Sequence, residues 1–374
     1  MTRVYLSPPN IGQDEVSAVT AALESGWVAP VGPEIGRFET EIAHAARRNH
    51  GVALSSGTAA LHLGLKALGV GQGDEVVVPT LTFAATAFAV CHAGAQPIFL
   101  DSEAESWGLD PELLGHLLAG RARAGKLPAA VVPVDLFGRT CSCQEITEIC
   151  SEYEIPLLWD SAEALGAAYG DSPAGSFGNA AAFSFNGNKI ITTSGGGALV
   201  TDDPEVAKRV RHWSTQSREP LPWFEHYEIG YNYRMSNVLA ALGRAQLAKL
   251  PDTVERRRAI RSRYASALDA IAGVTVVADP SWGRSNAWLT MVVFDSELHP
   301  SAAERVRKAL DASDIEARPV WKPMHSQPVF AEEEAVLSGV ADRVSREGLC
   351  LPSGTCMAEV DLDRVITIVK NEVS

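Results

Sequence analysis

The sequence has few cysteines, and none stands at the spacing of a structural zinc site. Six cysteines are scattered over 374 residues, and Cys141-Ser142-Cys143 is the only close pair. A zinc site of this kind needs a second pair of ligands at a comparable spacing, so we predict no metal site. Scattered thiols in a long chain are typical of reduced cysteines, and we therefore expect a cytoplasmic protein without disulfides.

Long apolar runs and excess positive charge are also missing. No apolar signal follows Met1-Thr2-Arg3, and no uninterrupted apolar span is long enough to cross a bilayer. The 32 basic residues are outnumbered by 46 acidic ones, which gives a net charge of −14. We therefore expect neither a nucleic-acid nor a membrane partner. An anionic ligand would need a site built locally from favourable donors.

The first two-thirds of the chain alternate short apolar runs with helical patterns. Helical patterns include Ala59–Leu68 and Gln144–Tyr153. Alternation of this kind predicts an α/β domain with a mainly parallel sheet, whose ligands bind beyond the carboxyl ends of the strands. The expected strands are Gly51–Leu54, Glu75–Pro79, Pro97–Asp101, Ala129–Val134, Ile155–Asp160 and Ala181–Phe185.

A long helical pattern runs from Ser236 to about Ile271 and is punctuated by Pro251. It contains Arg256-Arg257-Arg258, which we interpret as a solvated helix face. A smaller α+β segment follows, with expected strands Val274–Val277 and Trp288–Phe294. The sequence thus predicts a domain of residues 1–250 and a smaller C-terminal domain of residues 251–374. The extreme N-terminus is expected to pack on the smaller one.

One acid and one lysine stand out against this framework. Asp160 ends a buried apolar run, and Lys189 lies 189 − 160 = 29 residues later, in a segment of small residues before a triple glycine. This pair suits pyridoxal 5'-phosphate (PLP). A lysine can hold PLP as a Schiff base, and an acid can keep its ring nitrogen protonated.

Three further features each allow two interpretations. The turn Ser55-Ser56-Gly57-Thr58 leads into a helix, where free N–H groups can bind a phosphate or a serine can simply cap the helix. Phe83 can stack on a flat ring or belong to the core. His325, in a loop bounded by prolines, can contact substrate or serve a structural purpose. The Asp160 and Lys189 pair favours phosphate binding at the turn.

Several ordered motifs carry a family resemblance. They are Gly26–Glu34, Ser56–His62, Asp160–Gly166, the Lys189 segment and Gly230–Met235. On these motifs the chain resembles the PLP-dependent sugar aminotransferases of the DegT/DnrJ/EryC1/StrS family, of fold type I. The resemblance runs nearly from end to end.

The resemblance implies a role for each matching residue. Lys189 would be the catalytic residue, holding the cofactor and moving the proton, and Asp160 would pair with the pyridine nitrogen. The implied cofactor-binding residues are Ser56, Gly57, Thr58, Phe83, Asp160, Ala162, Glu163, Ser184, Lys189 and Asn232. Gly57, Thr58 and Ser184 would bind the phosphate, while Phe83 and Ala162 would lie against the two ring faces. Asn232 would reach the cofactor of a neighbouring subunit, and the role of Glu163 is left open.

The resemblance also implies a reaction and its partners. Glutamate would donate an amino group to a nucleotide-linked keto sugar, in a homodimer with shared active sites, and Trp27 and His325 are candidate substrate contacts. The motifs Asn186–Lys189 and Trp27–Pro30 favour C4 of a UDP-linked 4-keto-6-deoxy-N-acetylhexosamine. A dTDP- or GDP-linked keto sugar or a keto-cyclitol is the alternative. A related sugar dehydratase has histidine where Lys189 stands, and a non-catalytic scaffold would not need the Asp160 and Lys189 pair.

Overall fold

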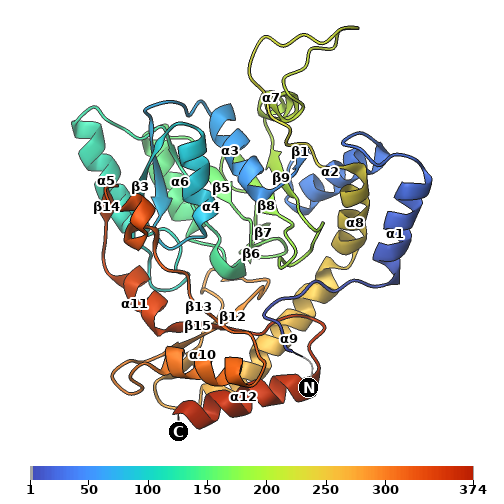
Figure 1. Ribbon diagram of the computed structural model, residues 1–374. Coiled ribbons are helices and arrows are strands. Elements are labelled where there is room, and N and C mark those ends of the chain that lie inside the picture. Colours follow the sequence, from blue (N-terminus) through green and yellow to red (C-terminus); the bar gives the residue numbers. More distant parts are fainter. Residues whose placement is uncertain (1–2, 374) are drawn as a thin grey trace.

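The computed structural model describes residues 3–373 and is built around one large twisted sheet (Figure 1). Its strands run in the order β1-β9-β8-β5 in one half and β14-β3-β2-β4 in the other. Parallel bridges from Val131 to Leu157 and from Val134 to Asp160 join the halves. The strands are β1 (His50–Leu54), β2 (Glu75–Pro79), β3 (Gln96–Leu100), β4 (Ala130–Val131), β5 (Leu158–Asp160), β8 (Ala180–Ser184), β9 (Gly197–Thr201) and β14 (Ala335–Val336).

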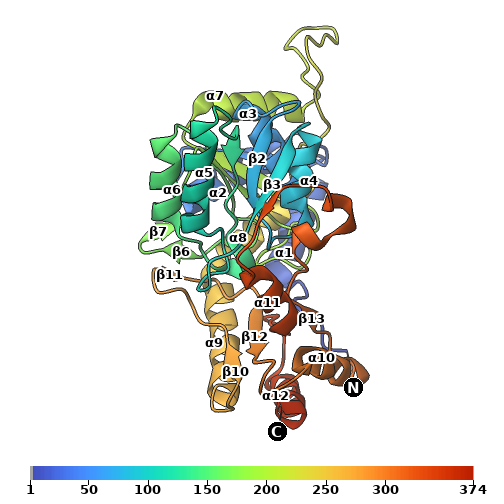
Figure 2. The ribbon, with the colours of Figure 1, turned by 90° about the vertical axis from the view of Figure 1, so that its left-hand side faces the viewer.

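Helices cover both faces of this sheet, which explains why its strands are apolar throughout. In β2 the consecutive valines Val76, Val77 and Val78 are fully buried, and they alternate between two hydrophobic clusters. Side chains of α2 (Pro33–Ala45), α5 (Pro111–Arg123) and α6 (Cys143–Glu152) pack in one cluster. Those of α3 (Gly57–Ala67), α4 (Ala84–His92) and α7 (Pro204–Ser214) pack in the other. Figure 2 shows α5 and α6 on one side of β2 and β3, and α4 on the opposite side. A strand buried on both faces has no polar side.

The predicted α/β class with a mainly parallel sheet is confirmed. Five neighbouring pairs in the sheet are parallel, counting the bridged junction of β4 and β5, whereas β9 runs antiparallel to both β1 and β8. The strand expected over Ala129–Val134 is shorter than predicted, because only Ala130–Val131 pairs regularly. Pro133 has no N–H to donate, although its carbonyl accepts from the amide of Asp160.

The long helical pattern is divided into two helices, α8 (Asn237–Ala248) and α9 (Leu250–Leu268). Pro251 lies in the first turn of α9, where its missing N–H costs nothing. The interpretation of the arginine run as a solvated face is wrong for Arg257, which is buried. Its guanidinium donates to the carbonyl of Trp288 at 2.5 Å and to Ser7 Oγ at 3.0 Å.

A second, antiparallel sheet lies below the large one in Figure 1. It consists of β10 (Val274–Val276), β12 (Thr290–Phe294), β15 (Gly348–Leu351) and β13 (Arg318–Pro319), and packs with α9, α10 (Ala302–Ala312) and α12 (Glu359–Val373). Val4 bridges Ile315 beside this sheet. Conversely, β14 belongs to the C-terminal part of the chain but pairs with β3 in the large sheet. A domain boundary at residue 250 stays a proposal.

The remaining elements connect these layers. They are α1 (Gln13–Glu24), η1 (Leu136–Gly138), β6 (Ala168–Tyr169), β7 (Ser172–Pro173), β11 (Gly283–Arg284), η2 (Met324–Ser326), η3 (Pro328–Phe330) and α11 (Val340–Glu347). The segment between α7 and α8 extends away from the body (Figure 1). Within residues 3–373, every helix is too short or too polar to span a bilayer.

Candidate active site

A cavity of about 200 Å³ opens where four strands of the large sheet end. The carboxyl ends of β1, β2, β5 and β8 lead directly into it, as expected for ligand sites in parallel sheets. Most of the site residues predicted from the sequence line this cavity. They are Ser56, Gly57, Thr58, Phe83, Asp160, Ala162, Glu163, Ser184 and Lys189.

One end of the cavity is the start of α3. Ser56 caps the helix by accepting a hydrogen bond from the amide of Ala59 at 3.0 Å, which leaves its hydroxyl hydrogen free to donate. The first helical amides, at Gly57 and Thr58, have no intrahelical acceptor. A Cβ added at Gly57 would lie 2.9 Å from Ser184 Cβ, so only glycine allows this approach. Backbone amides, hydroxyls and the helix dipole together favour an anion here.

Asp160 lies in the cavity wall at the end of β5, with both carboxylate oxygens fixed. Oδ2 accepts from Thr86 Oγ1 at 2.7 Å, and Oδ1 accepts from the amide of Ala162 at 3.1 Å. The Thr86 hydroxyl is itself 2.7 Å from that of Thr82. Burial raises the pKa of Asp160 to about 6, although these hydrogen bonds oppose the increase. The carboxyl group is therefore held in a fixed orientation in the cavity wall.

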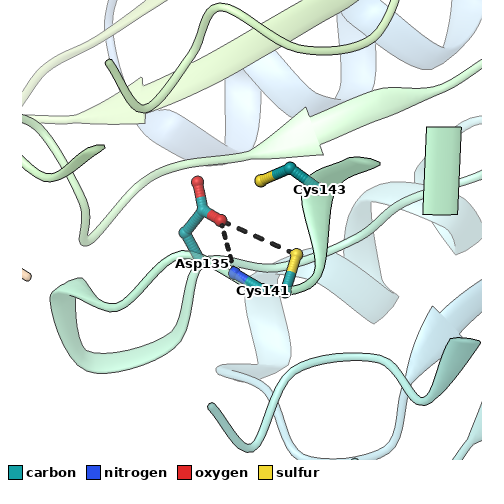
Figure 3. A group of neighbouring side chains, drawn as sticks. All are labelled: Asp135, Cys141 and Cys143. Carbon is teal, nitrogen blue, oxygen red and sulfur yellow. Dashed lines mark hydrogen bonds between the residues drawn. The ribbon is translucent and has the colours of Figure 1, made fainter. Parts of the chain in front are cut away.

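A second buried acid, Asp135, lies next to Asp160, and its amide donates to the Asp160 carbonyl at 3.0 Å. Cys141 and Cys143 lie beside the Asp135 carboxylate (Figure 3). Its oxygens accept from Trp159 Nε1, Ser161 Oγ and the amide and thiol of Cys141. Burial raises the pKa of both thiols, which keeps them protonated and poor metal ligands. We interpret this group as an anchor for the end of β5 rather than a metal site.

The amine of Lys189 is held between an acid and an aromatic ring. Its Nζ lies 3.1 Å from Glu163 Oε1 and 4.1 Å from the centroid of the Trp288 ring. Trp288 and Trp321, both from the C-terminal part of the chain, also line the cavity. These two tryptophans and Thr86 were not among the site residues predicted from the sequence. Trp288 begins an expected strand and Trp321 precedes the His325 loop, but no local pattern shows that either folds back onto Lys189.

The remaining predicted residues have different surroundings. Phe83 is 59% exposed at the cavity rim, so its interpretation as a core residue is wrong. Asn232 and Trp27 are exposed, and neither is among the residues lining the cavity. His325 is also absent from the lining, and its ring lies 2.7 Å from Thr80 Oγ1 and 3.3 Å from Asp342. Roles for Asn232, Trp27 and His325 in binding stay predictions.

These groups fit PLP. The start of α3 suits its phosphate, the oriented Asp160 carboxylate suits a protonated ring nitrogen, and the amine of Lys189 suits its aldehyde carbon. A close backbone contact at Gly197 also supports a phosphate site at the start of α3. A Cβ at Gly197 would lie 2.4 Å from the carbonyl carbon of Ser56, so only a glycine allows the two backbone segments to approach this closely.

Replacing Asp160 by asparagine is expected to stabilise the cofactor-free protein at alkaline pH. The folded pKa is about 6 against an ordinary value of 3.8, so the folded state binds the proton more tightly. The resulting stability is fully present below pH 3.8 and is lost as the pH rises through 6. An amide avoids this loss, because it never becomes charged.

The free energy of unfolding of Asp160→Asn should exceed that of wild type by roughly 1–3 kcal/mol at pH 8. Urea denaturation of both cofactor-free proteins from pH 4 to pH 8 measures the difference, which should be largest at pH 8 and shrink towards pH 4. A constant difference across this range would contradict a cost of burying the charge.

Comparison with known proteins shows clear similarities. Residues 9–370 match the DegT/DnrJ/EryC1/StrS aminotransferase family. EpsN of Bacillus subtilis (strain 168), whose name describes a pyridoxal phosphate-dependent aminotransferase, is 41% identical over 373 residues, covering 98% of this chain and 95% of that protein. GDP-perosamine synthase of Caulobacter vibrioides is 35% identical over 367 residues, covering 98% and 97%. The structure of DesI in the presence of its TDP-sugar product has a TM-score of 0.91 at 29% identity, covering 100% of this chain and 94% of that chain.

Proposed function

The chain belongs to the DegT/DnrJ/EryC1/StrS aminotransferase family, and we propose that it transfers an amino group from glutamate to C4 of a UDP-linked 4-keto-6-deoxy-N-acetylhexosamine. At the coarser level it is a PLP-dependent aminotransferase that acts on nucleotide sugars. The family resemblance and the fold-type I class predicted from the motifs are confirmed. The observation that carries the proposal is a single cavity that unites Lys189, Asp160 and the start of α3.

Each site residue has a proposed task. When bound, PLP supplies an electron sink and a carrier for the amino group. Lys189 would hold the cofactor and move a proton between carbon atoms, because its amine lines the cavity and an amine can act as both acid and base. Asp160 would keep the ring nitrogen protonated. The residues proposed to bind the rest of the cofactor are Ser56, Gly57, Thr58 and Ser184 at the phosphate, and Phe83, Ala162 and Glu163 around the ring.

Other residues exclude water and orient the reacting groups. Leu61, Trp288 and Trp321 give the cavity apolar walls. In a site with little water, the charges of Asp160 and Lys189 act more strongly on a reacting group than they would in solution. Trp27 and His325 remain candidate contacts to the sugar or its nucleotide.

Among the substrates expected from the sequence, the UDP- and GDP-linked keto sugars are the two that we favour. The motifs Asn186–Lys189 and Trp27–Pro30 favour the UDP-linked substrate. A GDP-linked keto sugar is the second candidate, because a relative 35% identical to this chain is named GDP-perosamine synthase. All six cysteines lie within residues 3–373 and are free thiols there, which supports a cytoplasmic location, where sugar nucleotides would be met.

The test is a screen of UDP-, dTDP- and GDP-linked 4-keto-6-deoxyhexoses with glutamate. Formation of 2-oxoglutarate and of the amino sugar is followed by mass spectrometry, with Lys189→Ala as the inactive control. We expect kcat/KM for the UDP-linked N-acetyl sugar to exceed the others by about tenfold or more. Preference for the GDP-linked sugar would support the second candidate. Conversion of glutamate with no sugar accepted would refute both.

We further propose a homodimer in which each subunit completes the other's active site. The segment between α7 and α8 supports this proposal, because it extends outward and exposes large apolar side chains. They are Trp223, Phe224, Tyr227 and Ile229, each more than half exposed. Such a patch is typical of a protein interface. Asn232 lies in the same segment, shortly after Ile229, and is exposed, so it is available to a second copy of the chain.

Mixing two inactive variants is expected to restore activity. Lys189→Ala and Asn232→Ala should each be impaired, but a heterodimer of the two would contain one doubly damaged site and one intact site. Random reassembly after mixed refolding should recover about one quarter of wild-type activity. Tags on the two variants allow heterodimers to be purified and assayed. Verified heterodimers as inactive as their parents would show that Asn232 does not act across the interface.

A further inference from the structure

Lys189 is not free in its cavity but paired with a buried carboxylate. Glu163 is only 4% exposed, and its Oε1 lies 3.1 Å from Lys189 Nζ. On another side, the same amine faces the ring of Trp288, whose centroid is 4.1 Å away. An acid and an aromatic face both stabilise an ammonium group relative to a neutral amine. The lysine amine is thus held by contacts on two sides, one with a carboxylate and one with an aromatic ring.

A specific local structure fixes the Glu163 carboxylate. Its second oxygen, Oε2, accepts from the amide of Phe137 at 2.7 Å. Phe137 presents that amide from a left-handed conformation with φ of 55°, which is costly for a phenylalanine. The next residue, Gly138, has φ of 83°, and a Cβ there would lie 1.8 Å from Asn286 Oδ1. The backbone of this turn is therefore strained, and the Phe137 amide that it presents orients the Glu163 carboxylate.

The same network connects the acid to the ring. Asn286 Nδ2 donates to the carbonyl oxygens of Glu163 and Leu165, and Asn286 Oδ1 accepts from the amide of Trp288. Trp288 Nε1 in turn donates to the carbonyl of Asn188, next to Lys189. Both groups that flank the amine are thus held by one asparagine. Their positions relative to Lys189 are set together.

Few other ionisable groups act on this pair. Asp160 interacts with both Glu163 and Lys189, and it is the group expected to pair with the cofactor ring. The Cys350 thiol faces Glu163, but burial raises its pKa and keeps it neutral. Arg257 contacts the backbone carbonyl of Trp288 rather than the carboxylate. Glu163 is therefore the acid in direct contact with the lysine amine.

We propose that Glu163 is the proton-exchange partner of Lys189. It holds the amine as an ammonium whenever the lysine is not joined to the cofactor, and it accepts a proton when the amine must be neutral. In that step an N–H bond of Lys189 breaks and an O–H bond of Glu163 forms, so atoms and charge balance without a further reactant. Glu163 thus acts through Lys189 as a positioning residue, and the proposal rests on the proposed role of Lys189 in proton transfer.

The first test measures Lys189 directly in the full chain without cofactor. Acetic anhydride labels the amine at a series of pH values, and peptide mass spectrometry gives its rate relative to the exposed Lys126. Loss of the carboxylate in Glu163→Gln should lower the midpoint of the Lys189 titration by about one pH unit or more. That change means roughly tenfold faster labelling near neutral pH. Glu163→Asp should lie between the two, and Glu75→Gln, which removes a distant acid, should leave the midpoint unchanged.

The second test uses the holoenzyme and the pH profile of its half-reaction with glutamate. The limb assigned to Lys189 should move in Glu163→Gln in the direction and by the amount seen in the labelling experiment. A merely structural role would lower the rate or the melting temperature without moving either midpoint, and that result would overturn the proposal. If Glu163→Gln fails to fold, Glu163→Asp and Trp288→Phe must each lower the labelling midpoint for the proposal to stand. The two proposals can fail separately. If Glu163→Gln lowers the labelling midpoint but the wild-type protein never converts glutamate, the proposed function is refuted and the pairing of Glu163 with Lys189 stands.

Discussion

Replacing Lys189 by alanine is expected to abolish transamination and covalent attachment of the cofactor. Lys189 is the lysine that lines the cavity with Asp160 and the start of α3. Its removal would take away both the proposed covalent anchor and the proposed base, so we expect turnover to fall by roughly 10⁴-fold or more. Binding of PLP through its phosphate and ring should persist in weaker form, because Ser56, Gly57 and Thr58 are unchanged.

Borohydride reduction locates the attachment site independently of activity. Wild-type protein loaded with PLP should be yellow, and reduction should fix the label to one peptide that contains Lys189. The exposed Lys126 offers a matched control, because Lys126→Ala should label and turn over like wild type. Recovery of the label on any other lysine would show that Lys189 does not bind the cofactor covalently.

Replacing Asp160 by asparagine should leave a protein that binds PLP but transfers amino groups very slowly. In the loaded enzyme, the carboxylate would face the ring nitrogen from a buried position, with both oxygens already oriented. Breaking a buried ion pair costs about 3–5 kcal/mol. If that cost falls mainly on the transition state, the rate should drop by about 10²–10⁴-fold.

A graded variant separates this effect from general damage. Thr86→Val removes one hydrogen bond to Asp160 but keeps the charge, so we expect a loss of about tenfold in turnover. Stopped-flow measurement of the half-reaction with glutamate gives the rate, and the absorbance of bound PLP reports its environment. An Asp160→Asn enzyme with near-normal turnover, or one less impaired than Thr86→Val, would disprove the role of this carboxylate.

The central pair could be predicted from the sequence because local order determines where it lies. Alternating strands and helices place the carboxyl ends of β5 and β8 at one edge of the sheet. Asp160 ends β5 and Lys189 follows β8, so their proximity follows from topology alone. The small residues around Ser56 and Gly57 could be interpreted in the same way, since helix starts bind anions wherever they occur.

The residues that surround the pair could not be found this way. Trp288 and Trp321 reach the cavity from the C-terminal part, and their approach depends on how the two sheets pack together. The burial of Arg257 could not be predicted from the sequence either. A run of three arginines is typical of a solvated face, yet packing against the Trp288 carbonyl buries the middle one. Tertiary contacts of this kind leave no periodic signal in the chain.

The parallel pairing of β14 with β3 also determines when the large sheet can be completed during synthesis. Ala335 pairs with Phe99, which was translated 335 − 99 = 236 residues earlier. Most of the large sheet is translated before residues 335–336 leave the ribosome. Until then, the outer side of β3 has no partner strand, so its backbone N–H and C=O groups remain an open edge. Open edges template pairing with other chains, and slow, long-range strand pairing prolongs that exposure. We therefore expect the yield of native enzyme in a host cell to depend on how well this edge is protected late in translation.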